Sequence, residues 1–439
     1  MSEYAHIKIR KLSLFSFRNY LNPAIVSLFF STRDLIVNHG VKEDIEDEDA
    51  GEYTQYLYRT TVKCAKDRFD ACGFTLSAFE KMFTNNALQM IDYSSFFRHL
   101  RIDWDKEEEI AKERVEKKVT FRKWKNAMQK IVSFELQNGN IYGYRDNSEL
   151  EISTECDKII YHTLKDDDSE SFYGLNCDAV PLSYVFRLIL ESCGDDDEIE
   201  LDFSNLQYWD DDCIEKALLA TQKIEKTIVL VEGTSDKDIL EFSLSKLYPH
   251  LSDLFYFMDF EDTRGGKRDG GTSFVIKNLK TFYFSKLKAN FIAIFDNDAE
   301  GYESRCTLLR EIKDWPDNFR ILLYPGLEFF HKYPTLFPNE KIVEDNIINK
   351  ACSIELYLPD SIIKENGAYY PIEWETRKIV RNEKGAKEAL YQGVISQKET
   401  IKESFHNLRK KIEKGEKSFA SEDWSRMKKL LETIVFAFK

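Results

Sequence analysis

The chain has 439 residues, about three times the size of a ~150-residue domain, so its length predicts two to four domains. Hydrophobic residues make up 43% of it and aromatic residues 14%, which is enough apolar material for a packed core and excludes a wholly disordered protein. The net charge of −15 argues against a surface coated with phosphate-binding cations. A local basic groove is still compatible with it, because nucleic-acid binding responds to local fields more than to the total charge.

Membrane and secretion signals are missing from the sequence. No apolar run approaches the ~20 residues of a membrane helix, and the opening MSEYAHIKIRKL has charges where a signal peptide needs its apolar stretch. The 8 Cys are scattered without a CxxC pair, so we interpret them as reduced, mostly buried thiols rather than as disulfides or a zinc site. We therefore expect a soluble, cytoplasmic protein without a membrane partner.

The first half of the chain shows mixed patterns. Residues 4–19 alternate like a strand or hairpin, and Pro23 stands near the start of an apolar stretch typical of a helix. Further helical patterns cover residues 55–85, 104–135 and 181–193. An acidic stretch ending near Asp212 is the best candidate for a boundary, so we predict a mixed α+β domain over residues 1–215.

After Lys226 short apolar strands alternate with helical segments. The predicted strands are TIVLVEG (227–233), LFYFMDF (254–260), NFIAIFDND (290–298) and FRILLYP (319–325). This alternation predicts an α/β fold with a mainly parallel four-stranded sheet flanked by helices. Ligands of such sheets bind at the carboxyl ends of the strands.

Acidic residues follow two of these strands. Glu232 closes the first strand, Asp236 lies in the first turn of the next helix, and Asp296 and Asp298 close the third strand as a D-x-D pair. Carboxylates that meet at a sheet end repel one another unless a hard cation such as Mg²⁺ or Mn²⁺ neutralises them. Any one of them alone is compatible with a helix cap or a solvated surface position, Asp236 above all. Together, in this order, they indicate a metal site.

The same residues carry a family resemblance. VEGTSDKDIL, a Gly-containing loop after the second strand, and FDNDAEG together resemble a Toprim domain, the Rossmann-like fold of topoisomerases, bacterial primases and OLD-family nucleases. The E-G-x-x-D spacing of Glu232 and Asp236, and Glu355 in SIELYL on a later helix, are similar to the OLD-type nuclease branch. The resemblance covers residues 225–360, which we predict to be the catalytic domain.

The resemblance implies a set of site residues. The metal ligands around one or two Mg²⁺ or Mn²⁺ ions would be Glu232, Asp236, Asp296, Asp298 and Glu355. All of these except Asp236 would also be catalytic. The chain has no GxxxxGK[ST] phosphate loop, so the resemblance places any nucleotide control in a separate ATPase or sensor partner.

The N-terminal YAHIKIRKLSLFSFRNYLNP resembles a domain attached to HEPN ribonuclease or Toprim modules in bacterial defence genes. We carry no catalytic residue over from it. Arg33 and His39 match the loose R-x(4–6)-H spacing of HEPN ribonucleases, but on an apolar helix such a pair is more often an edge salt bridge or a cap.

Two basic segments are candidates for binding phosphate. The Gly-rich loop carries Arg264, Lys267 and Arg268, and Lys277 follows on the next helix; a solvated loop without a ligand is the alternative. Residues 370–439 are predicted to be helical, with Lys and Arg interleaved with aromatic residues. That region is either a nucleic-acid clamp or a plain helical cap.

The leading hypothesis is a metal-dependent nuclease that hydrolyses phosphodiester bonds of DNA or of RNA such as tRNA, in bacterial antiphage defence. The defence role rests on family analogy alone. A primase-like nucleotidyl transferase and a non-catalytic partner module of an ATPase or sensor remain as alternatives. We also expect a homo-oligomer.

Overall fold

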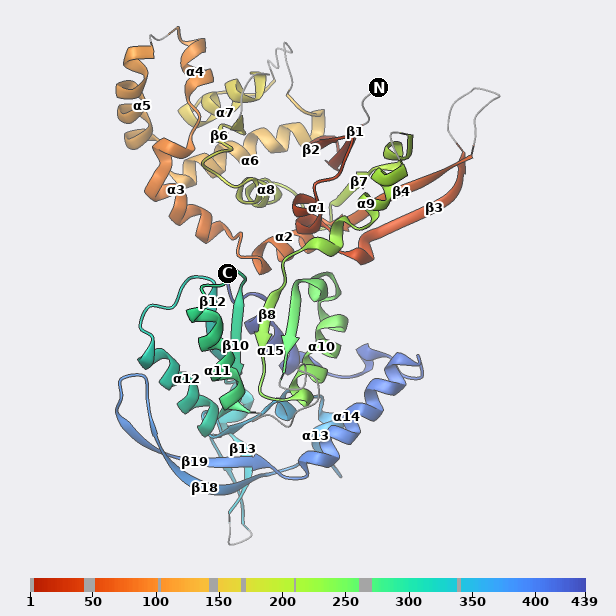
Figure 1. The fold of residues 1–439 in the computed structure, drawn as a ribbon, viewed down its shortest axis with the longest axis vertical. Coiled ribbons are helices and arrows are strands. Elements are labelled where there is room, and N and C mark those ends of the chain that lie inside the picture. The colour runs from red at the N-terminus through yellow and green to blue at the C-terminus, as the bar shows by residue number, and fades with distance from the viewer. Residues whose placement is uncertain are drawn as a thin grey trace. The chain divides into compact units, whose positions relative to one another are not determined.

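The computed structural model describes residues 4–42, 52–101, 104–141, 149–166, 171–208, 211–259, 271–337 and 341–439. The chain divides into an N-terminal unit, Met1–Ile224 with Lys439, and a C-terminal unit, Glu225–Phe438 (Figure 1). Each is described by itself. Among the helices in the described ranges, none is both long and apolar enough to cross a bilayer.

A five-stranded antiparallel sheet organises the N-terminal unit, with the strand order β2-β1-β7-β4-β3. The strands are β1 (Tyr4–Ile9), β2 (Leu12–Arg18), β3 (Leu35–Lys42), β4 (Glu52–Thr61) and β7 (Glu198–Asp202). The hairpin predicted over residues 4–19 is confirmed by the antiparallel pairing of β1 and β2. β7 lies inside the acidic run, where the apolar Ile199 and Leu201 alternate with acids and are fully buried.

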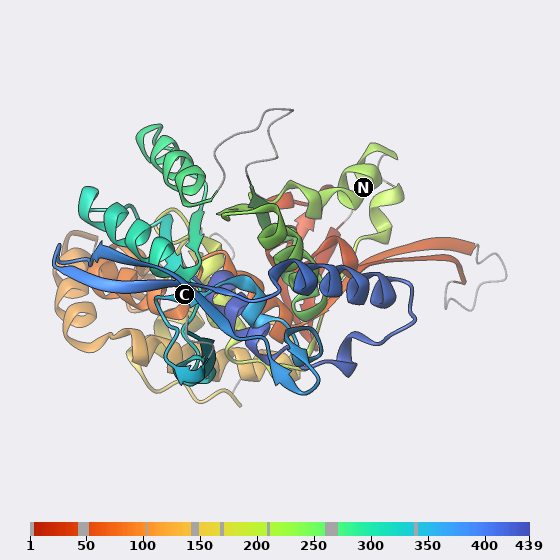
Figure 2. The same cartoon turned by 90° about the horizontal axis from the view of Figure 1, so that it is seen from below.

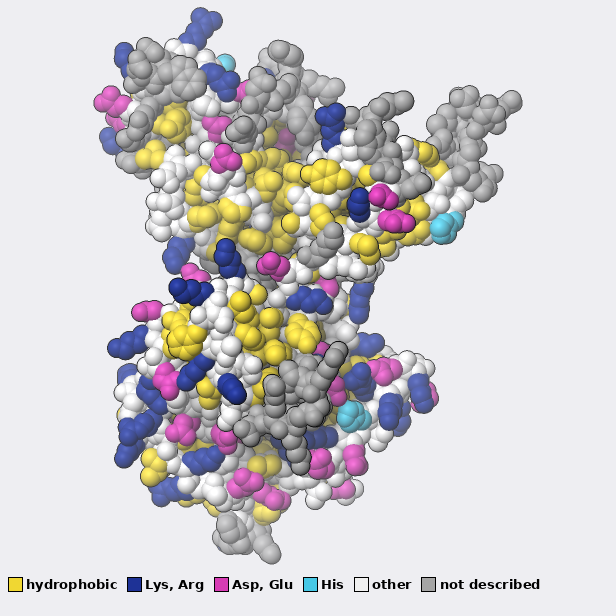
Figure 3. Space-filling view, viewed as in Figure 1, with side chains coloured by type: hydrophobic (Ala, Val, Ile, Leu, Met, Phe, Trp, Pro, Cys, Tyr) yellow, Lys and Arg dark blue, Asp and Glu magenta, His cyan; other side chains and the backbone are white. Residues whose placement is uncertain are grey.

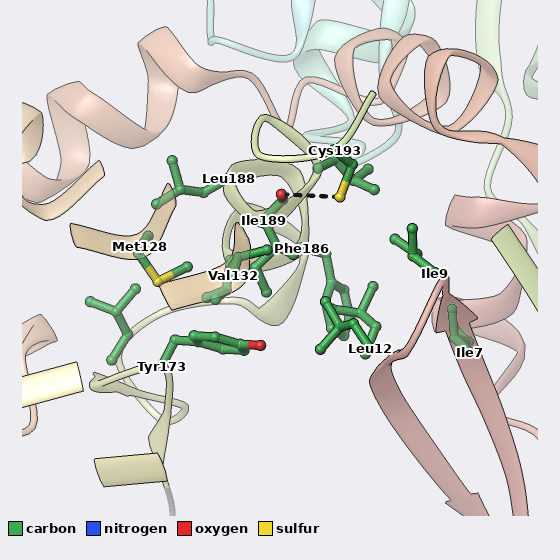
Figure 4. Packing of buried hydrophobic residues seen from close by; sticks show 14 of the residues in the cluster. Ile7, Ile9, Leu12, Met128, Val132, Tyr173, Phe186, Leu188, Ile189 and Cys193 are labelled. Atoms are coloured by element: carbon green, nitrogen blue, oxygen red, sulfur yellow. Dashed lines mark hydrogen bonds between the residues drawn. The ribbon is translucent and has the colours of Figure 1, made fainter. Parts of the chain in front are cut away.

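Helices pack against this sheet and against one another. They are α1 (Pro23–Phe29), α2 (Val62–Ala71), α3 (Leu76–Met90), α4 (Ser94–His99), α5 (Trp104–Lys118), α6 (Phe121–Asn138), α7 (Glu155–Lys165), α8 (Leu182–Leu190) and α9 (Asp211–Leu218). A short hairpin of β5 (Ser171–Phe172) and β6 (Leu175–Asn176) precedes α8. Figure 4 shows part of the shared core, where Leu12 of β2 lies near Phe186 of α8.

The helix expected over residues 55–85 is wrong at its start. Residues up to Thr61 belong to β4, because their alternating side chains pair with β3 on one side and β7 on the other. Arg33 lies in a 3-10 turn (Thr32–Asp34) and His39 on β3. The two residues therefore do not share the apolar helix that a HEPN-like pair requires.

A four-stranded parallel sheet forms the centre of the C-terminal unit and confirms the predicted α/β architecture. Its order is β12-β10-β8-β9, and all three pairings are parallel. The strands are β8 (Thr227–Leu230), β9 (Phe255–Met258), β10 (Phe291–Phe295) and β12 (Phe319–Leu323). The connecting helices are α10 (Thr234–Leu247), α11 (Thr272–Phe284) and α12 (Ala299–Glu311). β10 is buried at every residue, which explains its unbroken apolar sequence.

The connections of this sheet diverge at its centre. The chain runs from β8 to β9 on one side and then crosses to β10 on the other side of β8. In open α/β sheets, ligands bind at the carboxyl ends of the strands where the connections diverge in this way. Glu232 follows β8 and Asp296 follows β10, so both acids lie at this point.

The expectation that residues 370–439 are helical is wrong for their first third. β18 (Ile372–Arg381) and β19 (Lys387–Ile395) form an antiparallel hairpin in the sheet β14-β13-β18-β19 (Figure 2). The hairpin forms because apolar and β-branched residues recur at alternate positions, and Gly385 supplies the positive φ of +81° in its turn. Only α14 (Lys398–Glu413) and α15 (Ser425–Val435) are long helices here.

Smaller elements complete the unit. They are β11 (Asn297–Asp298), β13 (Tyr333–Leu336), β14 (Ile342–Asp345), β15 (Ala351–Cys352), the 3-10 turn η6 (Ile354–Tyr357), α13 (Asp360–Ile363), β16 (Lys364–Glu365) and β17 (Ala368–Tyr369). The pairing of β11 with β15 is antiparallel and joins the end of the β10 segment to a region some 50 residues further along the chain. It thereby brings η6 to the carboxyl end of the parallel sheet.

Candidate metal centre

Glu232 and Asp296 meet at the carboxyl ends of the two central strands. The backbone N–H of Asp296 donates to Glu232 Oε1 over 3.0 Å. Burial, followed by the negative charge of Asp298, raises the pKa of Glu232 to about 8. Burial and the neighbouring Glu232 also raise the pKa of Asp296 well above its ordinary range. The two carboxyls therefore share one buried, electronegative site.

The segment Asp296-Asn297-Asp298 is held as a rigid turn by its middle residue. Asn297 donates from Nδ2 to the carbonyl of Tyr324 over 2.8 Å and accepts at Oδ1 from the N–H of Asn349 over 2.7 Å. Asp298 caps α12 by accepting from the N–H of Gly301 over 2.7 Å. Only glycine fits at position 301, since a Cβ there would lie 2.1 Å from the Asp296 carbonyl oxygen. This close approach gives a physical reason for the glycine in FDNDAEG.

Asp236 and Glu355 form a second pair of acids beside the first. Asp236 lies in the first turn of α10, and burial together with the charge of Glu355 raises its pKa to about 7. Glu355 is also buried, on η6. The sequence placed it on a helix, but it lies on one 3-10 turn whose position is set by the pairing of Asn297 with Cys352.

A lysine from the C-terminal region faces these acids. Lys398 begins α14, and its Nζ lies 3.4 Å from Glu355 Oε1. Burial acts to lower the pKa of Lys398, but the attraction of Glu355, Asp296 and Asp236 outweighs burial and raises it. Among the described residues, Lys398 therefore offsets the negative charge of these acids, and Lys402 on the same helix acts on the pKa of Asp236 in the same direction.

Two side chains of the β18–β19 hairpin attach to the N-terminus of α12. Gln392 on β19 donates from Nε2 to Asp298 Oδ2 over 2.6 Å and accepts at Oε1 from the N–H of Glu300 over 3.2 Å. Lys378 on β18 lies 3.0 Å from Glu300 Oε2. The hydrogen bond from Lys378 is the main reason why the pKa of Glu300 is lowered. The hairpin thus fixes the orientation of Asp298.

The five acids offer carboxylate oxygens that are suitable ligands for a hard divalent cation. Asp296 Oδ1 and Glu355 Oε2 are buried and have no hydrogen-bond partner among the described residues, and a buried polar atom without a partner costs free energy. The donor set is made of carboxylate oxygens, which Mg²⁺ and Mn²⁺ prefer. Across the described ranges, however, no three Asp, Glu, His or Cys side chains already form a ligand set. Binding would therefore require some acids to exchange a protein partner for the ion, as for Glu355 with Lys398.

The structure brings the five acids predicted from the sequence to one end of the sheet. The predicted phosphate-binding role of four basic residues stays a prediction. Lys277 is exposed on α11. The other three, Arg264, Lys267 and Arg268, lie outside the described residues.

Sequence reasoning missed Lys398 and Gln392. Both belong to the region that was interpreted as helical, and neither lies in a motif. No local signal marks them, because their partners are far away along the chain: Asp298 is 94 residues from Gln392.

Comparison with known proteins identifies the N-terminal half. Residues 1–218 match the family model of HEPN/Toprim N-terminal domain 1, which supports a HEPN/Toprim-associated protein and points to a function related to nucleic acids. No curated protein matches the chain, and no solved structure matches it.

Proposed function

We propose, from the premise that this is a HEPN/Toprim-associated protein, that the C-terminal unit is a Toprim-type nuclease of the OLD branch. It would hydrolyse phosphodiester bonds of DNA or RNA with Mg²⁺ or Mn²⁺. A role in bacterial antiphage defence, a separate ATPase or sensor partner and a homo-oligomeric state belong to the proposal by family analogy.

One observation carries the proposal. Glu232 and Asp296 are in contact at the point where the connections of a four-stranded parallel sheet diverge, and Asp236, Asp298 and Glu355 lie around them. Carboxylic acids are rarely buried together at such cost to stability unless the group of them has a function. A cation-binding function explains the cost, since a bound ion would relieve the repulsion.

The five acids would bind two metal ions between them. Glu232 and Asp236 would hold one ion, and Asp296, Asp298 and Glu355 would hold a second or share both. Bound divalent ions supply a water of lowered pKa as nucleophile and neutralise the leaving oxygen. Gln392 keeps Asp298 oriented toward its neighbours, and Lys398 offsets charge at the Glu355 side.

The test is an incubation of the full chain with DNA, total tRNA or nucleoside triphosphates, in Mg²⁺ or Mn²⁺ and then in EDTA. We expect cleavage that EDTA stops. Incorporation of nucleotides in place of cleavage would favour a primase-like transferase. If the wild type shows neither cleavage nor nucleotide incorporation but binds the metal tightly, the result would favour a partner module that does not cleave nucleic acid by itself.

Replacing Gln392 by Ala is expected to weaken Mn²⁺ binding about 10- to 100-fold, because residues that orient a metal ligand have effects of this size. Asp298 would lose its 2.6 Å hydrogen bond but keep its charge. Titration calorimetry with Mn²⁺ measures the change. Gln89→Ala, at an exposed position of α3, is the matched control and should bind like the wild type. Equal affinities in both variants would contradict the orienting role of Gln392.

Replacing Lys398 by Met is expected to destabilise the metal-free protein by about 1–2 kcal/mol. Breaking a fully buried ion pair costs about 3–5 kcal/mol; the expected loss is smaller because 36% of the Lys398 side chain is exposed. Saturating Mn²⁺ should recover most of the loss, since the ion then offsets the acids. Chemical denaturation with and without Mn²⁺ measures both values, and Lys410→Met on the exposed face of α14 is the control.

A further inference from the structure

The β18–β19 hairpin has two chemically different faces. The strands pair from Ile372 with Ile395 to Arg381 with Lys387, and one extra residue, Glu375, shifts the register. Neighbouring residues of a strand point to opposite faces. Beyond Glu373, β18 pairs only with β19. Most of the hairpin is therefore a two-stranded ribbon.

One face of the ribbon is attached to the rest of the unit. Gln392 and Lys378 on this face bond to the N-terminal turn of α12. Val380, also on this face, is fully buried. These contacts hold the ribbon in place and leave its other face free to meet a partner.

The outward face is basic and aromatic. Its cations are Arg377, Arg381 and Lys387, and Tyr391 lies directly opposite Arg377 in the register. From Arg377 to Tyr391, beyond the extra residue Glu375, no outward strand position carries an acid, although the whole chain has a net charge of −15. Figure 3 shows Lys and Arg side chains gathered along the edge of the C-terminal unit where Figure 1 draws the hairpin tip and α12.

Exposed apolar side chains lie between these cations. Ile379 is 68% exposed and Tyr391 48% exposed. The Tyr391 ring lies 5.9 Å from that of Trp374, which in turn lies 6.3 Å from that of Phe337. Lys350 Nζ lies 5.8 Å from the Trp374 ring centre and 3.5 Å from Asp345 Oδ2, so its charge is partly balanced. The face is therefore a row of aromatic rings flanked by positive charge.

We propose that the outward face of the β18–β19 hairpin binds single-stranded nucleic acid. Arg377, Arg381 and Lys387 would contact the phosphates, and Tyr391 and Trp374 would stack on bases. Aromatic platforms flanked by cations are how proteins bind unpaired strands of any sequence. Bases inside a duplex are stacked on one another and do not offer their faces to such rings. The bound strand would be a polyanion, which matches the acid-free outward positions between Arg377 and Tyr391.

This inference rests on the proposed function, because the bound strand would be the nuclease substrate. Tyr391 and Gln392 are adjacent in β19 and point to opposite faces. The ribbon thus joins the strand-binding face directly to the residue that orients Asp298. DNA and RNA share the chemistry that this face recognises.

The test measures binding of labelled oligothymidylate and oligouridylate of about 20 nucleotides, and of a duplex of equal length, to the full chain in EDTA, over a range of salt concentrations. Arg377→Ala/Arg381→Ala/Lys387→Ala should weaken single-strand binding at least about tenfold. It should also reduce the slope of log K against log salt by about 2, since each contact to a single strand contributes about 0.7. Lys410→Ala/Lys411→Ala/Lys414→Ala removes three positive charges at exposed positions at the end of α14 and should leave both values near those of the wild type.

A second variant separates stacking from charge. Tyr391→Ala should weaken binding about tenfold with the salt slope unchanged, and Tyr391→Phe should keep the wild-type affinity. The inference is overturned if the hairpin and control triple variants bind alike, if a duplex binds as tightly as a single strand, or if the wild type binds neither oligonucleotide. Binding that depends on the hairpin, without cleavage in Mn²⁺, would support this inference and sink the nuclease proposal. Cleavage that stays unchanged in the hairpin variants would support the nuclease proposal and contradict this inference.

Discussion

Asp296→Asn is expected to lower metal-dependent cleavage by at least about 10³-fold, because it removes one charge from the ligands that would hold the ion. The same substitution should stabilise the metal-free protein by about 1–2 kcal/mol near neutral pH, since the neutral amide removes the cost of either protonating this buried carboxyl or leaving it charged beside the other acids. Asp296 is the acid whose pKa is raised by burial, Glu232, Asp236 and Asp298 together. A more stable protein without activity is the signature of a binding site rather than of a structural residue.

The matched control for Asp296 is Asp314→Asn, at an exposed position after α12 in the same unit. It should change neither cleavage nor the free energy of unfolding in EDTA. Glu232→Gln is expected to behave like Asp296→Asn, because the two side chains lie at the same strand ends. Undiminished cutting by both site variants would remove the nuclease proposal, and a loss of stability in EDTA would show that the acids serve the fold instead.

Stability without metal is expected to fall as pH rises from about 5 to about 8. The pKa of Glu232 is raised to about 8 and that of Asp236 to about 7, so the folded state keeps protons that the unfolded chain has already lost. Where the folded state binds more protons, the free energy of unfolding decreases with increasing pH. Thermal unfolding in EDTA across this range measures the slope.

Saturating Mn²⁺ should abolish this slope, because neither the metal-bound folded state nor the unfolded chain then keeps the protons of these acids. The ion competes with the protons on Glu232 and Asp236, so its affinity should rise about tenfold per pH unit for each proton released. The shift in melting temperature on adding Mn²⁺ is therefore expected to be small at pH 5.5 and large at pH 8. The double variant Glu232→Gln/Asp236→Asn should show a smaller slope in EDTA and a smaller pH-dependent shift, and Asp296, whose pKa burial also raises, accounts for what remains. A wild-type protein that becomes more stable with pH in EDTA would contradict the buried, protonated acids.

The local sequence pattern was sufficient to predict the parallel sheet and the acids that follow its strands. Each strand is a short apolar run followed by a helical period, and parallel strands with such connections end on one edge. Glu232 and Asp296 therefore had to lie near each other once β8 and β10 were recognised. Even the glycine of FDNDAEG has a local cause, the close approach of Gly301 to the Asp296 carbonyl.

The surroundings of the acids depended on packing between segments that are far apart in the chain. Residues 372–395 carry charges at many positions, so their sequence is compatible with an exposed helix as well as with a two-stranded ribbon. They form strands because β18 and β19 pair with each other and β18 pairs with β13. Gln392 and Lys398 reach the acids only because that ribbon and α14 fold back onto the sheet. Periodicity along one segment places side chains on its own faces; which face meets which distant partner is settled by the burial and hydrogen bonding of the whole unit.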